Sequence, residues 1–196
     1  MSKPSNSSIN VRGLTFLVAD QNAFFSSLCN SILRSFGAGK ILEARNTADT
    51  VDMLVQNKVD LLLCDAKLPA DGGLELTRWI RFNSEAEFRA MPILIMTGDP
   101  RMRAITAARD VGANMVVTKP LSPSLLFDRL AWIAHSSRKF VDSSKYYGPD
   151  RRFKIEGFPN GVGRRKGDQA TDLGEATGPA MSQDDIDKLL KTARSG

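Results

Sequence analysis

The fold is decided by the stretch Val59-Asp60-Leu61-Leu62-Leu63-Cys64-Asp65, which is followed four residues later by Pro69. Its apolar run has the length of a strand and ends abruptly on a carboxylate. A strand that is apolar on both faces belongs in the middle of a parallel sheet covered by helices on each side. Functional groups gather at the carboxyl ends of such strands, so Asp65 is a candidate site residue. Taken alone, a turn aspartate that caps the next loop is an equal alternative.

Apolar runs and apolar residues at helical spacing alternate along most of the chain. Four further strands are expected at residues 14–20, 40–44, 91–96 and 115–118. Helices are expected at 22–36, 47–57, directly after Gly72-Gly73, at 102–111 and at 123–136. Five strands that alternate with five helices predict an α/β fold with a doubly wound, five-stranded parallel sheet.

Composition limits the remaining classes of protein. The chain has 196 residues, enough for one ordinary domain and an additional segment, and 42% of them are hydrophobic. No apolar run approaches the roughly 20 residues that span a bilayer. Residues 1–12 are short, polar and serine-rich, so we expect a disordered N-terminus, no signal peptide and a cytoplasmic protein. Cys29 and Cys64 are expected in the core, and His135 on the surface near a helix end.

Polar residues end or directly follow four of the expected strands, namely Asp20, Asp65, Thr97 and Lys119. These strand ends lie close together at one edge of a doubly wound sheet. Two carboxylates can hold Mg²⁺, which prefers oxygen ligands, and the cation neutralises a phosphoryl group that arrives at Asp65. Lys119 and Thr97 can bind the phosphoryl oxygens. Four unrelated polar caps are the alternative, which the presence of the full quartet disfavours.

Residues 13–136 resemble a response-regulator receiver domain of the CheY-like family. The resemblance rests on the motifs Leu17-Val18-Ala19-Asp20, Leu63-Cys64-Asp65 with Pro69 and Gly73, Met96-Thr97-Gly98, and Lys119-Pro120. It implies the flavodoxin-like strand order 2-1-3-4-5 and phosphotransfer from a histidine kinase or phosphotransfer protein to Asp65, assisted by Mg²⁺. It also implies that the surface near Thr97 rearranges around the aspartyl phosphate. Such a receiver assists its own phosphotransfer and dephosphorylation but is not an enzyme that turns over a substrate.

Three residues depart from the family pattern. Gln21 follows Asp20 where the family usually has a second acid, which is normally a direct metal ligand. We therefore expect the metal set Asp20, Gln21, Asp65 and Lys67 to bind Mg²⁺ more weakly. Lys67 would contribute its backbone carbonyl, although its ammonium could occupy part of the site, and a solvated lysine is the blander alternative. Val116 stands where many relatives have Tyr or Phe, so the aromatic relay is expected to be absent or replaced.

Residues 137–181 are expected to form a flexible linker, because they are rich in Gly, Pro and charge and show no apolar periodicity. Residues 138–166 hold nine Lys or Arg against three acids. The pairs Arg151-Arg152 and Arg164-Arg165 are candidate anion- or nucleotide-binding residues, and they resemble the arginine-rich tails of CheY-like proteins that bind cyclic di-GMP. A solvated linker and non-specific contact with nucleic acid are alternatives. No DNA-binding output domain follows residue 137, so specific DNA binding is not expected.

Residues 182–194 predict a short amphipathic interaction helix. Ser182 is an N-cap, and Asp185 stands three positions further on. Ile186, Leu189 and Leu190 form one apolar face. The segment resembles the N-terminal peptide of the flagellar switch protein FliM, which docks on phosphorylated CheY. It is therefore expected to bind a receiver, its own or that of another CheY-like protein; packing on its own domain is the alternative.

Two functional classes remain after these observations. The first is a phosphoacceptor switch of a two-component phosphorelay whose output in chemotaxis, motility or related signalling runs through protein contacts. The second is a phosphate-independent adaptor, in which the incomplete metal site leaves only the interactions of the tail with another receiver or with cyclic di-GMP.

Overall fold

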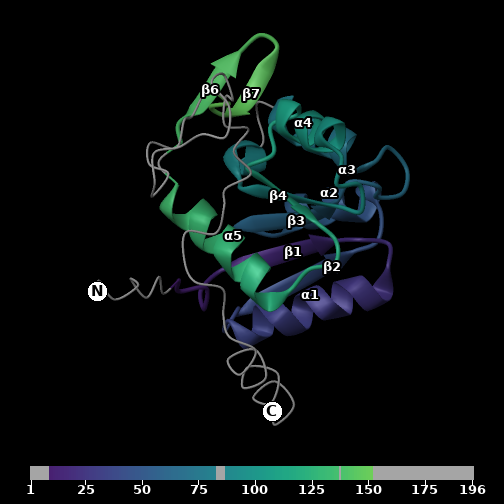
Figure 1. Ribbon diagram of the computed structural model, residues 1–196, viewed down its shortest axis with the longest axis vertical. Helices are drawn as coiled ribbons and strands as arrows, with labels where there is room; N and C mark the ends of the chain where they lie inside the picture. The colour runs from purple at the N-terminus through teal and green to yellow at the C-terminus, as the bar shows by residue number, and fades with distance from the viewer. Residues whose placement is uncertain (1–8, 83–86, 137, 152–196) are drawn as a thin grey trace.

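The computed structural model describes residues 9–82, 87–136 and 138–151. Five parallel strands form the central sheet in the order β2-β1-β3-β4-β5, shown in Figure 1. Their bounds are β1 Thr15–Ala19, β2 Lys40–Ala44, β3 Leu61–Asp65, β4 Ile93–Thr97 and β5 Met115–Thr118. The predicted doubly wound sheet and its strand order are confirmed.

Helices connect the strands at the expected places. They are α1 Ala23–Ser35, α2 Thr47–Gln56, α3 Gly73–Phe82, α4 Met102–Asp110 and α5 Pro123–His135, with a short 3₁₀ helix, η1, at Glu87–Ala90. The side chains of Asn22, Asn46 and Ser122 each accept a hydrogen bond from the backbone N–H three residues further on. These N-caps satisfy backbone donors that have no partner inside the helix, so they fix where α1, α2 and α5 begin.

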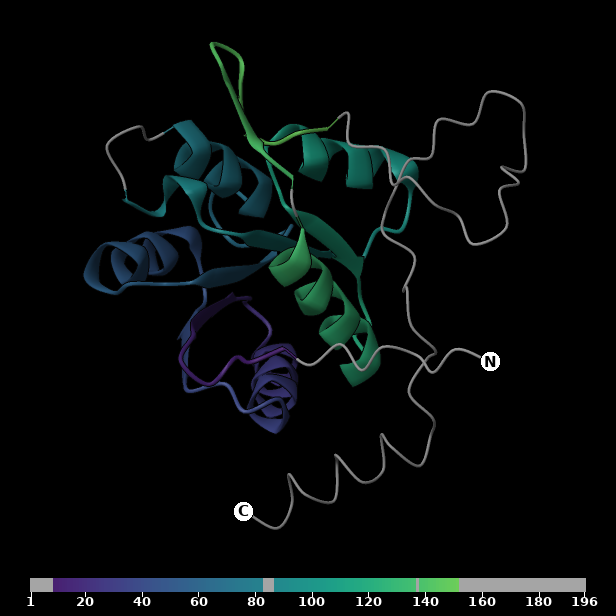
Figure 2. The ribbon, with the colours of Figure 1, turned by 90° about the vertical axis from the view of Figure 1, so that its left-hand side faces the viewer.

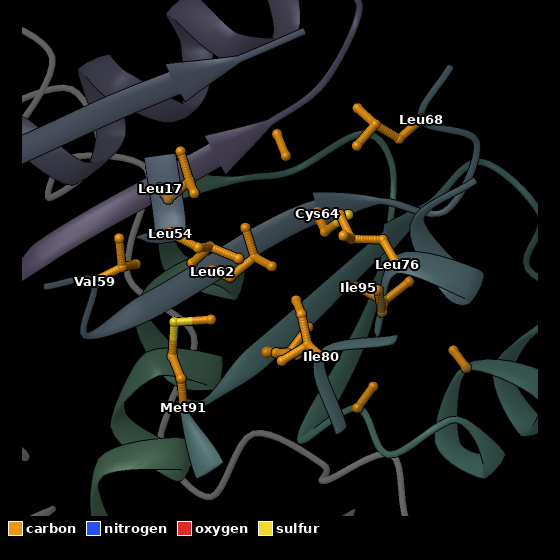
Figure 3. Packing of buried hydrophobic residues seen from close by; sticks show 14 of the residues in the cluster. Leu17, Leu54, Val59, Leu62, Cys64, Leu68, Leu76, Ile80, Met91 and Ile95 are labelled. Carbon is orange, nitrogen blue, oxygen red and sulfur yellow. The ribbon is translucent and has the colours of Figure 1, made fainter. Parts of the chain in front are cut away.

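The central strand β3 separates two apolar cores, and every one of its residues is buried. Leu62 and Cys64 face the core formed with α2, α3 and α4, part of which Figure 3 shows. Leu61 and Leu63 face the core formed with α1 and α5. This alternation follows from the two-residue period of a strand, and it explains why both faces of β3 are apolar. Cys29 and Cys64 lie in these cores, and His135 is exposed at the end of α5, as expected.

The ordered chain extends beyond both expected boundaries. Residues 9–12 were expected to belong to a disordered N-terminus, yet Val11 is buried against the α1–α5 core and its carbonyl accepts a hydrogen bond from the Leu14 N–H. At the other end, residues 140–149 were expected in a flexible linker. They form an antiparallel hairpin of β6 (Phe140–Ser143) and β7 (Tyr146–Pro149). The hairpin lies beside α4 in Figures 1 and 2.

A buried arginine at the end of α3 lies beneath the hairpin and connects the segments around it by hydrogen bonds. The Arg81 side chain is fully buried, and its guanidinium lies 5.3 Å from the Phe140 ring centre. It donates hydrogen bonds to four acceptors, the carbonyls of Gly112 (2.9 Å), Arg89 (2.6 Å) and Met91 (2.9 Å) and the side-chain oxygen of Asn114 (2.8 Å). Burial lowers the pKa of Arg81 to about 10, which leaves it protonated at neutral pH.

Two further arginines and a glycine contact hold the hairpin. The guanidinium of Arg89 lies 3.6 Å from the Tyr147 ring centre, and that of Arg151 lies 4.1 Å from the Tyr146 ring centre. Such cation–π contacts each contribute about 0.5–2 kcal/mol. A Cβ on Gly148 would come within 2.8 Å of the Gly112 Cα, so only glycine permits this approach of the two backbones. The linker expected from residue 137 therefore cannot begin before the hairpin ends.

In the part of the chain that the structure describes, no helix combines the length and the apolar character needed to cross a membrane. The expected remainder of the linker (152–181) and the interaction helix (182–194) lie outside the described residues.

Candidate functional site

The carboxyl ends of β1 and β3 bring two carboxylates together. In the parallel register Ala19 lies opposite Cys64, so the next residues, Asp20 and Asp65, are neighbours at one edge of the sheet. The Asp20 side chain has no exposed surface, and that of Asp65 is 11% exposed. Asp65 can therefore be reached from outside, whereas Asp20 lies behind it.

The ends of β4 and β5 bring Thr97 and Lys119 to the same edge. Thr97 lies opposite Thr118, and the Lys119 N–H donates to the Thr97 carbonyl at 2.8 Å. The Thr97 hydroxyl oxygen accepts a hydrogen bond from the Asp99 N–H at 3.0 Å. The hydroxyl keeps its own hydrogen for a second partner, because it both donates and accepts.

Lys119 bridges the two carboxylates. Its Nζ lies 2.5 Å from Asp20 Oδ2 and 3.0 Å from Asp65 Oδ2, and 4.1 Å from the centre of the Phe25 ring. Partial burial alone would lower the pKa of Lys119, but the hydrogen bonds to Asp20 and Asp65 outweigh it and raise the pKa above its ordinary value. The ammonium is therefore a firmly held positive charge between the two acids.

The remaining carboxylate oxygens are fixed by backbone donors. Asp20 Oδ1 accepts from the Asn22 N–H at 2.9 Å, and Asp65 Oδ1 accepts from the Lys67 N–H at 3.2 Å. These bonds set the orientation of both carboxyl groups before any ligand arrives.

An open cavity of about 490 Å³ lies over Asp65. The residues that line it are Asp65, Lys67, Gly98, Asp99, Pro100, Arg101 and Lys119. Gln21 is exposed and is not one of these lining residues, whereas Lys67 is both exposed and on the cavity wall. Of the residues expected to hold a metal, Asp20 and Asp65 thus lie together, joined by Lys119.

Sequence reasoning missed one pair of this cavity, Asp99 and Arg101. Arg101 Nε donates to Asp99 Oδ1 at 2.7 Å, and its Nη2 lies 2.5 Å from Asp99 Oδ2. The side-chain hydrogen bond from Arg101 holds the pKa of Asp99 well below its ordinary value. The signal in the sequence was an acid and a base, two residues apart, directly after Thr97-Gly98.

Val116 and Cys64 complete the surroundings of the site. Val116 is buried in β5 opposite Ile95. Burial raises the pKa of the Cys64 thiol far above its ordinary value, so the thiol next to Asp65 stays protonated and unreactive.

Arg151, one of the four candidate anion-binding arginines, lies away from this edge. Its Nη1 is 2.7 Å from Asp110 Oδ1 at the end of α4, and it stacks on Tyr146 of the hairpin. It belongs to the folded domain and not to a free linker. The other candidates, Arg152, Arg164, Arg165, Asp185, Ile186, Leu189 and Leu190, lie outside the described residues.

A doubly wound sheet with an acid pair, a lysine and a threonine at its carboxyl edge defines a class of signalling domain. The sequence model of the response regulator receiver domain matches residues 16–131, which is more than half of the chain. The chain therefore belongs to the response regulator receiver domain family. Receiver domains are in general signalling domains of two-component systems and not enzymes, and they act together with histidine kinases or phosphotransfer proteins.

Individual relatives agree with this assignment. The chain is 28% identical over 118 residues to a chemotaxis protein CheY homolog of Campylobacter jejuni, covering 60% of this chain and 89% of that one. It is 30% identical over 118 residues to the CAI-1 autoinducer sensor kinase/phosphatase CqsS of Vibrio cholerae, where it covers 60% of this chain but only 17% of that protein. The crystal structure of a response regulator from Chloroflexus aurantiacus, 27% identical, superposes with a TM-score of 0.57 over 61% of this chain and 96% of that one.

Receiver domains typically bind Mg²⁺ at their acidic pocket, and the residues present here partly fit such an ion. Asp20 and Asp65 both contact the same ammonium, that of Lys119. The two carboxylates are therefore close enough to ligate one small cation together. The third acid of the usual set is replaced by Gln21, and among the described residues no group of three His, Cys, Asp or Glu gathers at one point. The donor set thus suits a hard divalent ion but carries one negative charge fewer than usual.

Proposed function

We propose that this protein is a phosphoacceptor switch of a two-component phosphorelay, with Asp65 as the phosphorylated residue. The observation that supports it is the Asp20–Lys119–Asp65 bridge at an open cavity, with the Thr97 hydroxyl at the same edge. Of the two carboxylates in this group, Asp65 is the one that can be reached from outside. The phosphodonor is a histidine kinase or a phosphotransfer protein, since these carry the phosphohistidine that a receiver uses.

The chemistry is a displacement at phosphorus. A carboxylate oxygen of Asp65 attacks the phosphoryl group of a phosphohistidine, a P–O bond forms, the P–N bond breaks, and the imidazole leaves with a proton from solvent. Lys119 keeps its positive charge beside the accepting oxygen and can follow the phosphoryl group as charge builds on it. The Thr97 hydroxyl donates its free hydrogen to another phosphoryl oxygen.

A bound Mg²⁺ supplies further charge neutralisation for the phosphoryl oxygens. The residues that would hold it are Asp20, Asp65, the backbone carbonyl of Lys67 and the side-chain amide of Gln21. A neutral amide in place of a carboxylate weakens the attraction for a divalent ion, so we expect a higher Mg²⁺ concentration at half-saturation than in receivers with two adjacent acids.

Phosphorylation by acetyl phosphate tests the proposal. The wild-type protein is expected to gain one phosphoryl group, seen by intact mass, and Asp65→Asn is expected to gain none. Replacing the carboxylate by an amide removes the nucleophile and changes the side-chain shape little. Equal labelling of both proteins would assign the phosphoryl group elsewhere, and no labelling of either would refute a phosphoacceptor role.

A phosphate-independent adaptor is the second candidate. It is favoured by Gln21 and by Lys119, whose ammonium already satisfies both carboxylates without any ligand. In this function the receiver fold acts as a scaffold, and only its contacts carry the signal. The acetyl phosphate experiment separates the two candidates.

The output is proposed to run through protein contacts of a cytoplasmic protein in chemotaxis, motility or related signalling. In this proposal the tail helix, through Asp185, Ile186, Leu189 and Leu190, binds a receiver domain. In the same proposal the arginines of the basic segment bind cyclic di-GMP. Replacing Leu189 and Leu190 by Ala is expected to abolish binding to a receiver in a pull-down with purified proteins. Undiminished binding of the double variant would remove the tail from the proposal.

A further inference from the structure

Three positive and three negative side chains meet at the phosphoryl site. The ammonium groups of Lys67 and Lys119 and the guanidinium of Arg101 line the cavity, together with the carboxylates of Asp65 and Asp99. Asp20 adds the third carboxylate from behind Lys119. The formal charges therefore balance while Asp65 carries no phosphoryl group.

Phosphorylation would upset this balance. An acyl phosphate on Asp65 replaces one negative charge by about two and offers three acceptor oxygens. Lys119 can turn to one oxygen but is shared with Asp20, and Thr97 can serve a second. In receivers with two adjacent acids a firmly bound metal ion takes much of the remaining charge, and in this chain the weaker acid set leaves that charge to be met by another cation.

Arg101 is the guanidinium among the residues that line the cavity. Two nitrogens of its planar guanidinium contact the two carboxylate oxygens of Asp99. The same geometry fits two phosphoryl oxygens. The pair is tied to the switch threonine, because the Asp99 N–H donates to the Thr97 hydroxyl oxygen. The Arg101 side chain is 63% exposed, so water and not packing surrounds it and it is free to change partner.

We propose that Arg101 is a phosphoryl-positioning residue of this receiver, which exchanges the carboxylate of Asp99 for the phosphoryl group at Asp65. This inference rests on the proposed function of Asp65. Asp99 is then a competitor that keeps Arg101 in place while Asp65 is unmodified. The exchange makes phosphoryl uptake less dependent on Mg²⁺ than an arginine-free site with the same two acids would be.

The test is the initial rate of phosphorylation by acetyl phosphate over a series of Mg²⁺ concentrations that begins with EDTA and no added metal. Arg101→Ala is expected to lower the rate about ten-fold at low Mg²⁺ and less at saturating Mg²⁺, as for the loss of one solvent-accessible charged hydrogen-bonding group. Arg101→Lys should recover part of the rate, since it keeps the charge but loses the fork. Arg103→Ala is the matched control: it removes the same charge from an exposed position two residues further on that does not line the cavity.

Asp99→Asn supplies an independent readout. It frees Arg101 from its partner, so the affinity for beryllofluoride, which mimics the phosphoryl group, is expected to rise several-fold. The same substitution in an Arg101→Ala background should give no gain. A gain of equal size in both backgrounds would assign the effect to Asp99 alone and would overturn the proposal.

The outcomes separate this inference from the function on which it rests. If wild type is labelled and Arg101→Ala behaves like wild type, or if Arg103→Ala is slowed as much as Arg101→Ala, Arg101 has no specific role. If neither wild type nor Asp65→Asn is labelled, the phosphoacceptor function itself fails. Because Arg101 and Arg103 are both exposed, their substitution is expected to leave the melting temperature unchanged. Measuring the melting temperature of each variant checks that it folds.

Discussion

Each edge of the sheet holds a cationic side chain, half-buried Lys119 at one and fully buried Arg81 at the other, and the two charges have opposite kinds of partner. At the carboxyl edge Lys119 lies between two carboxylates, Asp20 and Asp65. At the amino edge Arg81 donates to three backbone carbonyls and one amide oxygen, and none of these four acceptors is charged. Lys119 keeps 20% of its side chain exposed beside an open cavity, whereas Arg81 is completely covered.

The two cationic groups differ in how easily they can change their hydrogen-bond partners. An ammonium has three donors that rotate freely, so Lys119 can release one acceptor and take another. The guanidinium of Arg81 is a rigid fork whose donors meet the backbone of two segments, residues 89–91 and residue 112. It fastens α3, η1 and the turn before β5 to one another and supports the hairpin. This difference supports the proposed phosphotransfer at the carboxyl edge and a structural role for the amino edge.

The comparison predicts its largest effect for Arg81→Met. Methionine fills much of the same volume but removes all four hydrogen bonds and leaves the carbonyls of residues 89, 91 and 112 without the guanidinium donor, whereas the Asn114 side-chain oxygen keeps the Ile93 N–H. We therefore expect the free energy of unfolding to fall by about 3–5 kcal/mol. Urea unfolding of the purified protein measures it. The control is Arg78→Met on the same helix, an exposed residue whose loss should change stability by less than about 0.5 kcal/mol. Equal effects of the two substitutions would contradict a fastening role for Arg81.

Lys119→Met should have a smaller effect on stability. It leaves the buried carboxylate of Asp20 facing Asp65 without a cation, and we expect a loss of about 3 kcal/mol, part of which Asp20→Asn should restore. The pKa of Lys119 is raised in the folded protein, so its contribution is fully present at neutral pH and is lost only as the pH rises through that raised pKa, above the ordinary value of 10.5. The difference between wild type and variant should thus be constant between about pH 7 and pH 9. A difference that disappears within this range would show that the bridge does not stabilise the fold.

The sequence predicted the carboxyl edge well because parallel pairing leaves little freedom there. Once residues 61–65 are a central strand, the register fixes which residues follow the neighbouring strands, and Asp20, Asp65, Thr97 and Lys119 must converge. The pairing of Asp99 with Arg101 was not predictable in the same way. Arg101 is exposed and Asp99 only partly buried, so both side chains can adopt many rotamers and no apolar pattern selects among them.

The hairpin was missed for a different physical reason. Its two strands have only four residues each, and Gly148-Pro149 is typical of a chain break. Most of what stabilises it comes from residues distant in sequence, the guanidinium groups of Arg81 and Arg89 and the bare backbone at Gly112. A two-stranded hairpin is marginal by itself, so local sequence carried little signal that one would form.

Ending the chain after residue 138 rather than after residue 151 should cost the least of the three changes, about 2 kcal/mol. Removal of the hairpin takes away the Tyr146 and Tyr147 contacts with arginines, each cation–π contact contributing about 0.5–2 kcal/mol, and this loss is partly offset because fewer residues need to be ordered. The cost is smaller than that of Arg81→Met because the guanidinium stays on its four acceptors and only its cover is lost. Urea unfolding of the two shortened chains measures the difference. If the shorter chain were as stable as the longer one, the hairpin would lie on the domain without stabilising it, and the ordering at the amino edge would be due to Arg81 alone.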